Sequence, residues 1–138
     1  MHKVLLDTNV VLDFLSSERP SHDLAVSLVT DLQATGIKLC LVATSLKDVY
    51  YILGRSDGEQ AARQAVIALA GSMNILPVDA SCCRQALTST EPDFEDGIIR
   101  AAAEMADVDY VVTRDRRAFI GSQVPRITPA DLKRELPL

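Results

Sequence analysis

Aromatic residues and histidines are scarce in this chain of 138 residues, which has no tryptophan, three tyrosines, three phenylalanines and two histidines. With so few rings, the sequence offers no evident platform on which nucleic-acid bases would stack. A reaction that cleaves phosphodiester bonds with a pair of imidazoles also has little support, because His2 and His22 are the only histidines in the chain.

Cysteine is sparse as well, and Cys40, Cys82 and Cys83 are odd in number and lack Cys-x-x-Cys spacing. Neither a disulfide framework nor a zinc site is indicated, so we expect small core or helix-face residues. Charged residues interrupt every apolar run before it reaches a membrane-spanning length, and the first residues lead into a strand rather than a signal-peptide core. We therefore expect a soluble, cytoplasmic protein with no membrane contact.

Basic residues are outnumbered, since 14 Lys and Arg against 19 Asp and Glu give a formal net charge of -5. This balance argues against the broad basic surface of a protein that coats nucleic acid by charge alone. It does not exclude chemistry on nucleic acids, because a cluster of metal-binding carboxylates itself lowers the net charge. The length is typical of one domain, so we expect residues 1–138 to form a single domain.

Apolar runs that suit buried strands alternate with segments of helical periodicity along the chain. The pattern predicts strands at residues 4–6, 37–42, 74–78, 110–112 and 126–127. It predicts helices at residues 10–15, 24–36, 46–54, 58–70, 79–87, 94–105 and 129–136. Gly54 is expected to end the third helix, and Pro129 to begin the last. Such alternation requires an α/β fold in which a mostly parallel sheet of about five strands has helices on both faces.

Two of these strands are followed by an acidic residue. Asp7 comes directly after the first strand, and Asp115 follows the strand at 110–112. Because the carboxyl ends of parallel strands lie at one edge of a sheet, where ligands bind in open α/β folds, we expect the two side chains to converge. The alternative for Asp7 is that it caps the helix that follows.

Two further acidic positions lie on predicted helices. Asp48 lies at the border of the buried face of its helix, where a carboxylate needs a cation or metal partner unless it is simply exposed to water. Asp93, Glu95 and Asp96 precede an apolar helix. They suit a capping role that complements the helix dipole, and one of them can also point at the site.

The residues that carry these features resemble the successive signatures of PIN domains. The resemblance covers nearly the whole chain and rests on four segments: Leu5-Leu6-Asp7-Thr8-Asn9, residues 43–53 (ATSLKDVYYIL), residues 93–97 (DFEDG) and residues 109–115 (DYVVTRD). Four segments in the right order are far more specific than one. A chain of this size looks most like a VapC-type toxin of a bacterial toxin-antitoxin pair.

The resemblance implies a three-layer α/β/α sandwich and a metal-dependent ribonuclease with an acidic pocket. Matched position by position, the acidic quartet is Asp7, Asp48, Asp96 and Asp115. The polar residues beside it are Thr8, Asn9 and Thr113, with Asp93 and Glu95 as secondary candidates. The family more often has Glu at the place of Asp48, and Ala at the place of Gly97.

Carboxylates with few histidines suit a hard cation, so Mg²⁺ or Mn²⁺ is the expected cofactor. Asp7, Asp96 and Asp115 are expected to hold it, with Asp48 binding it directly or orienting a water. We expect a metal-activated water to attack the phosphorus in line, without a covalent enzyme intermediate. The candidates for phosphate contacts are Arg55, Arg114, Arg116 and Arg117. The alternative is that these arginines are solvated surface charges.

Two other functions fit the sequence. In one, the domain is degenerate and binds RNA or a protein without cutting, which the shorter Asp48 side chain favours. In the other, a phosphohydrolase of another α/β family uses Asp7 as nucleophile. The family resemblance implies a cognate antitoxin and a homodimer, for which surface would come from Val10, Val11, Leu12, Phe14, Tyr50 and Tyr51. The alternative for these apolar residues is core packing.

Overall fold

Five parallel strands form the central sheet of the computed structural model, which describes residues 1–137. Their order across the sheet is β3-β2-β1-β4-β5. The bounds are β1 (Lys3–Leu6), β2 (Lys38–Val42), β3 (Asn74–Leu76), β4 (Tyr110–Val112) and β5 (Arg126–Ile127). The predicted α/β class and parallel sheet are confirmed.

Seven helices connect and follow these strands within the described part of the chain. They are α1 (Thr8–Leu15), α2 (His22–Ala34), α3 (Ala43–Asp57), α4 (Glu59–Ser72), α5 (Ala80–Thr88), α6 (Phe94–Ala106) and α7 (Pro129–Glu135). None of these seven helices, which all lie in residues 1–137, is both long and apolar enough to cross a membrane.

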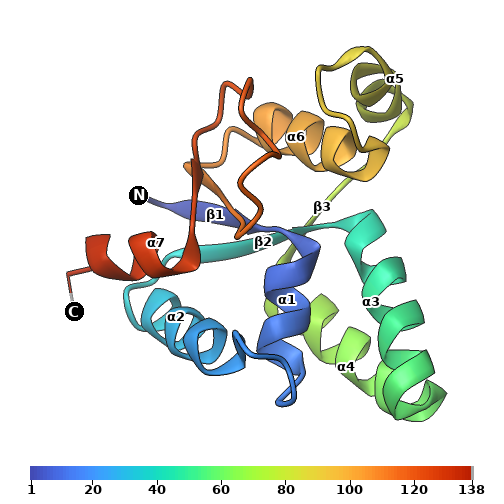
Figure 1. Cartoon of the computed structure of the whole chain (residues 1–138), viewed down its shortest axis with the longest axis vertical. Coiled ribbons are helices and arrows are strands. Elements are labelled where there is room, and N and C mark those ends of the chain that lie inside the picture. The colour runs from blue at the N-terminus through green and yellow to red at the C-terminus, as the bar shows by residue number, and fades with distance from the viewer. Residues whose placement is uncertain (138) are drawn as a thin grey trace.

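The strands bury both faces because their side chains alternate between two hydrophobic cores. Val4 and Leu6 pack with residues of α1, α2, α3, α4 and α7, while Leu5 packs with residues of α5 and α6 and of the segment after β4. Figure 1 shows these two groups of helices on opposite sides of the sheet. The predicted three-layer α/β/α arrangement is therefore confirmed.

The strand order reverses direction between β1 and β4. From β1 the chain moves outward to β2 and β3, and then returns across the other face through α5 and α6 to place β4 beside β1. The loops after β1 and β4 therefore diverge at the carboxyl edge of the sheet. In open parallel sheets this crevice is where ligands bind.

Most predicted boundaries differ from the observed ones by one to three residues, and two of these differences have a clear physical cause. Gly54 does not end α3, which continues to Asp57 and stops at Gly58, whose φ of 95° is a left-handed conformation that glycine adopts at little cost. Gly54 instead faces α4, where an added Cβ would lie 3.9 Å from the Cβ of Ala62. The strand predicted to extend to residue 78 ends at Leu76, because the next residue is Pro77, which has no N–H for the ladder.

Candidate active site at the carboxyl edge of the sheet

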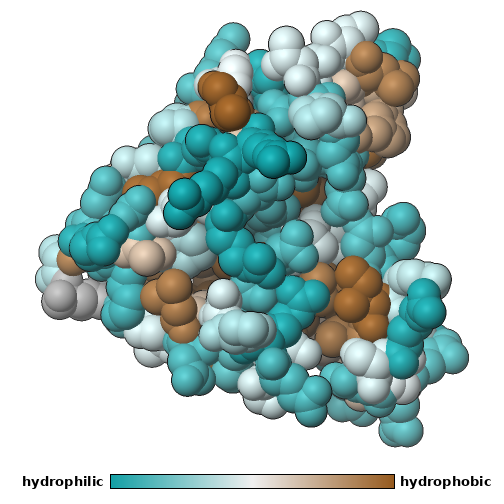
Figure 2. All heavy atoms as spheres, in the orientation of Figure 1, coloured by the Kyte–Doolittle hydropathy of each residue, from teal (hydrophilic) through white to brown (hydrophobic). Residues whose placement is uncertain are grey.

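A pocket with a volume of about 280 Å³ lies at the crevice between the loops that follow β1 and β4. We call it the acidic pocket because six of its lining residues carry carboxyl groups: Asp7, Asp48, Asp93, Glu95, Asp96 and Asp115. The remaining lining residues are Thr8, Asn9, Leu12, Tyr51 and Ile52. Figure 2 shows hydrophilic side chains where α1, α3 and α6 meet, beside an apolar patch between α1 and α3. The fold thus brings together all four acids of the predicted quartet.

Asp7 lies deepest among these acids, with 5% of its surface exposed. Burial raises the pKa of its carboxyl group, and the hydroxyl of Thr113, which donates a hydrogen bond of 2.8 Å to Oδ2, partly offsets that rise. Asp7 occupies the N-cap position of α1, but its side chain makes no capping hydrogen bond. The carboxylate of Asp7 is therefore oriented by Thr113, which directly follows β4, and it does not cap the helix.

Asp96 faces Asp7 from the first turn of α6. Its pKa is raised to about 7, mainly by burial and then by the negative charges of Asp7, Asp93 and Asp115. Asp93 is the N-cap of that helix, because its side chain accepts hydrogen bonds from the backbone N–H groups of Glu95 at 2.8 Å and Asp96 at 3.4 Å. The capping role considered for Asp93 is thus present, and it fixes the turn that presents the other two acids.

Glu95 has a more central place in the pocket than its prediction as a secondary candidate implies. The hydroxyl of Thr8 donates to its Oε1 at 3.1 Å, and its pKa is raised to about 7 by burial and by the adjacent carboxylate of Asp48. Asp48 is half-buried on α3 and lies 3.2 Å from Nζ of Lys47. Asp48 and Glu95 therefore form a pair of neighbouring acids on one side of the pocket, and the carboxylate of Asp48 directly affects the ionisation of Glu95.

Ser45 is a residue of the site that the sequence did not single out. Its fully buried hydroxyl lies 2.7 Å from the hydroxyl of Thr8, which in turn contacts Glu95. A sequence signal for Ser45 was available, because this serine lies on the inner face of α3, three residues before Asp48. A hydroxyl buried there needs a hydrogen-bonding partner. The chain of contacts from Ser45 through Thr8 holds Glu95 in the pocket.

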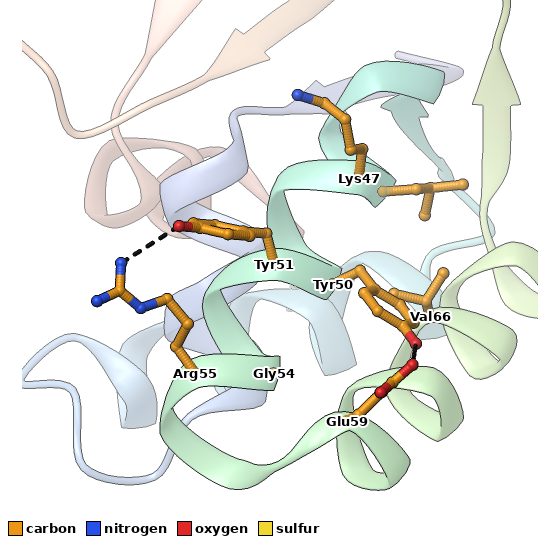
Figure 3. A pocket seen from close by; sticks show the side chains of 8 residues that line it. Lys47, Tyr50, Tyr51, Gly54, Arg55, Glu59 and Val66 are labelled. Carbon is orange, nitrogen blue, oxygen red and sulfur yellow. Dashed lines mark hydrogen bonds between the residues drawn. The ribbon is translucent and has the colours of Figure 1, made fainter.

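An apolar groove adjoins the acidic pocket on the outer side of α3. It has a volume of about 580 Å³ and is lined by Leu46, Lys47, Tyr50, Tyr51, Gly54, Arg55, Glu59 and Val66. Figure 3 shows Tyr51 and Arg55 on one side of α3, and Tyr50 with Glu59 and Val66 on the side toward α4. Tyr51 lines both the groove and the acidic pocket, so it forms the border between them.

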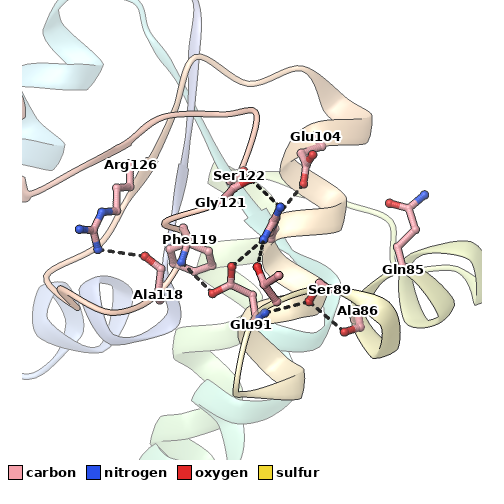
Figure 4. Close-up of polar contacts among 12 residues, drawn as sticks. Gln85, Ala86, Ser89, Glu91, Glu104, Ala118, Phe119, Gly121, Ser122 and Arg126 are labelled. Carbon is pink, nitrogen blue, oxygen red and sulfur yellow. Dashed lines mark hydrogen bonds and ion pairs between the residues drawn. The ribbon is translucent and has the colours of Figure 1, made fainter.

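The loop after β4 is fixed on both sides of Asp115. The backbone N–H of Asp115 donates to the hydroxyl of Thr113 at 3.0 Å, and Asp115 Oδ1 accepts from the N–H of Arg117 at 2.8 Å. Farther along, Glu91 accepts from the N–H of Phe119, as Figure 4 shows. Arg100 donates to the carbonyl of Gly121. These contacts anchor the loop to the segment around α6.

The four arginines considered for phosphate contacts have different surroundings. Arg114 is engaged by the buried carboxylate of Asp13 at 2.7 Å, and Arg55 donates to the hydroxyl of Tyr51 at 3.3 Å. Arg116 and Arg117 are exposed beside Asp115. Arg116 also lines a pocket of about 240 Å³ that contains Thr113 and Asp115. The exposed pair is thus better placed than Arg114 to meet a ligand.

The donor set of the acidic pocket suits a hard divalent cation, because carboxylate oxygens are the ligands that Mg²⁺ and Mn²⁺ prefer. The raised pKa values of Asp96 and Glu95 reflect negative charge that such a cation would neutralise. Across residues 1–137, however, no three histidine, cysteine or acidic side chains are already positioned to hold one metal ion. The chemistry of the residues fits the ion, while their side chains are not gathered around one point.

Solved structures show the same fold. VapC20 of Mycobacterium tuberculosis, described as a sarcin-ricin loop cleaving toxin, has a TM-score of 0.64 and 19% identity over 78% of this chain and 86% of that one. VapBC2 from Rickettsia felis, bound to a promoter DNA fragment, has a TM-score of 0.70 and 13% identity, with coverages of 91% and 98%. A toxin-antitoxin complex from Klebsiella pneumoniae has a TM-score of 0.67 and 22% identity, with coverages of 91% and 97%.

At the sequence level, no match was found among curated proteins. A family model described as PIN domain matches residues 3–117. That range contains the four acids of the predicted quartet and the two secondary candidates, Asp93 and Glu95. Because the match covers most of the sequence, this chain belongs to the PIN domain family.

Proposed function

We propose that this protein is an endoribonuclease that depends on Mg²⁺ or Mn²⁺ and serves as the toxin of a toxin-antitoxin pair. The acidic pocket carries the proposal, because it gathers six carboxyl groups at the crevice of a parallel sheet and raises the pKa of two of them to about 7. Membership of the PIN domain family supports the nuclease chemistry. The likeness in fold to VapC20 and to the Klebsiella complex supports RNA as substrate and an antitoxin as partner.

Asp7, Asp96 and Asp115 are the residues proposed to hold the metal, with Asp48 contributing directly or through water. When bound, such a cation activates water and stabilises the charge that develops on the leaving oxygen. The hydroxyl of Thr113 orients Asp7 for this task, and the hydroxyl of Thr8 holds Glu95 against the pocket. Asp115 lines the same pocket, and its backbone N–H donates to the hydroxyl of Thr113.

The reaction proposed is hydrolysis by in-line attack of water on phosphorus. The water oxygen bonds to phosphorus, the bond to the leaving oxygen breaks, and that oxygen takes up a proton. No side chain becomes covalently attached to the substrate. Exposed Arg116 and Arg117 would contact the phosphates on the side of Asp115, and Arg55 on the side of α3.

The cognate antitoxin and a second copy of the chain are the proposed protein partners. Val10, Val11 and Leu12 belong to the core and leave no surface for such contacts. Phe14 and Tyr50 are partly exposed, and Tyr51 is exposed. The side of the apolar groove toward α4, lined by Tyr50, Glu59 and Val66 (Figure 3), is the surface that we propose for the antitoxin.

The test is cleavage of a mixed RNA pool by the purified protein with Mg²⁺ or Mn²⁺, with EDTA, and with Asp7→Asn in parallel. Asp57→Asn, which removes an exposed acid at the end of α3, is the matched control. We expect cleavage by the parent protein and the control, and its loss with EDTA and with Asp7→Asn. Cleavage that persists in EDTA would refute the metal dependence.

A second candidate is a domain that binds RNA or protein without cleaving. Two observations favour it: the absence, in residues 1–137, of three acids already placed around a metal, and the ion pair that Lys47 makes with Asp48. A folded protein that binds RNA yet cuts none across metals and substrates would select this candidate over the enzyme.

A further inference from the structure

Helix α3 carries two tyrosines that each lie beside an arginine, and their surroundings differ. The guanidinium of Arg55 lies 5.7 Å from the ring centre of Tyr51, and that of Arg63 lies 5.8 Å from the ring centre of Tyr50. Tyr50 is partly buried against α4, where its hydroxyl donates to Glu59 at 2.9 Å. Tyr51 is 62% exposed and lines the acidic pocket. Figure 3 shows the two rings pointing to different sides of the helix.

Tyr51 is the aromatic side chain of residues 1–137 that lines the acidic pocket. Its ring is flanked by Ile52, which is 39% exposed and lines the same pocket, and by the guanidinium of Arg55. Because most of its surface is exposed, the ring of Tyr51 is accessible to a ligand in the pocket. A flat aromatic face with an arginine beside it is the combination on which single-stranded nucleic acid stacks its bases.

The charge of the pocket favours a contact of this kind for an RNA substrate. Six carboxyl groups repel the phosphates that must approach them, and the whole chain has a net charge of -5. Phosphate contacts alone would therefore give weak binding at this site. A base that stacks on Tyr51 supplies affinity that does not depend on charge, while Arg55 attracts the adjoining phosphate.

We propose that Tyr51 and Arg55 form a subsite that stacks one unpaired base of the RNA, next to the phosphate held in the acidic pocket. The inference rests on the proposed function, because it concerns the same substrate. It assigns the substrate class as RNA that is single-stranded or flipped out at this nucleotide, since a base within a duplex cannot stack on a protein ring. Ile52 closes the apolar side of the subsite.

The experiment compares Tyr51→Phe and Tyr51→Leu with the control Tyr50→Leu. Binding of a cleavable single-stranded RNA is measured by fluorescence anisotropy in an Asp7→Asn background, and cleavage is measured with Asp7 intact. A set of RNAs, each with one abasic nucleotide, maps the position that stacks. Thermal unfolding of each variant identifies any that fails to fold. If Tyr51→Leu fails to fold, the abasic series with the parent protein keeps the test valid, because the absence of any abasic position that weakens binding would overturn the inference.

We expect Tyr51→Leu to weaken binding and raise KM about tenfold, while Tyr51→Phe, which keeps the ring, stays close to the parent protein. Tyr50→Leu should leave RNA binding unchanged. One abasic position beside the cleavage site should weaken binding to the parent protein by a similar factor. The same position should cause no further loss in Tyr51→Leu, because ring and base form one interaction.

Three results would overturn the inference. The first is equal RNA binding by Tyr51→Leu and the parent protein, and the second is an abasic effect that is unchanged by that substitution. The third is normal RNA cleavage by Tyr51→Leu together with lost self-association in sedimentation, which would assign the ring to a protein contact. Each leaves the proposed function standing, whereas a parent protein that cuts no RNA refutes the proposed function itself.

Discussion

Asp13 illustrates how single residues outside the acidic pocket shape it. It lies on α1, with 2% of its surface exposed, and binds Arg114 through Nε at 2.7 Å and Nη2 at 3.3 Å. Arg19 contacts the same carboxylate at 3.2 Å. Because α1 follows Asp7 and Arg114 precedes Asp115, this ion pair joins the two loops that form the pocket. A buried carboxylate requires such partners.

We predict that Asp13→Asn lowers the free energy of unfolding by about 2 kcal/mol, because two charge-assisted contacts are lost and the amide satisfies the guanidinium groups poorly. Urea unfolding followed by circular dichroism measures the change. Asp23→Asn, which alters an exposed acid on α2, is the matched control and should change stability by less than about 0.5 kcal/mol. Equal midpoints for Asp13→Asn and the parent protein would show that the ion pair does not stabilise the fold.

At the level of residues, the sequence predicted the convergence of Asp7 and Asp115, because both follow apolar strands of one parallel sheet. It could not predict the partner of Arg114, since Asp13 lies 101 residues away and reads as one acid in a helix. The central place of Glu95 was equally hidden. It depends on Ser45 and Thr8, which meet only when α3 packs beside α1.

At the level of elements, the packing of α5 against α6 explains why residue 97 is glycine. A Cβ at Gly97 would lie 3.0 Å from the Cβ of Ala86 and 3.1 Å from its Cα and carbonyl oxygen. Two of these atoms are backbone, so the contact is relieved only if the helices separate. Gly97 directly follows Asp96, and the close approach of the helices therefore bears on the position of the acids.

We predict that Gly97→Ala destabilises the protein by about 1–3 kcal/mol, since overpacking outweighs the better helix propensity of alanine. It should also reduce RNA cleavage, because α6 carries Glu95 and Asp96 into the pocket. Gly71→Ala is the matched control, because nothing lies within 4 Å of the added Cβ on α4, and it should be neutral or stabilising by up to about 1 kcal/mol. Chemical denaturation of both variants decides the matter, and equal stability of the two would contradict the packing argument.

The strands and helices were largely predictable from the sequence because hydrophobic periodicity and turn residues agree along most of the chain. The strand at 110–112 and the strand at 126–127 were predicted with their observed bounds. The end of α3 was not, because a glycine inside a helix and a glycine after it look alike in sequence. Only the left-handed backbone at Gly58 and the packing of Gly54 against Ala62 distinguish them.

For the whole molecule, folding concentrates negative charge at one edge of the sheet. In the unfolded chain the acids are far apart and titrate near their ordinary pKa values, 3.8 for aspartate and 4.5 for glutamate. In the folded chain Asp96 and Glu95 titrate at about 7 because burial and neighbouring carboxylates oppose their ionisation. The acidic pocket therefore costs stability at neutral pH, which is typical of sites whose residues are arranged for function.

This cost predicts how stability depends on pH and metal. Between about pH 4 and pH 7 the folded protein binds more protons than the unfolded chain, so without metal the free energy of unfolding should fall as pH rises through this window and level off above it. Asp96→Asn should flatten the profile, because the amide carries no charge.

At pH 8 a saturating concentration of Mn²⁺ should restore stability, by about 2.7 kcal/mol at 100 times Kd, in the parent protein but not in Asp96→Asn. Urea unfolding at pH 5 and pH 8, with Mn²⁺ or with EDTA, measures all four states. Metal-free protein that is more stable at pH 8 than at pH 5 would contradict the repulsion, and equal stabilisation of both proteins by Mn²⁺ would place the ion elsewhere.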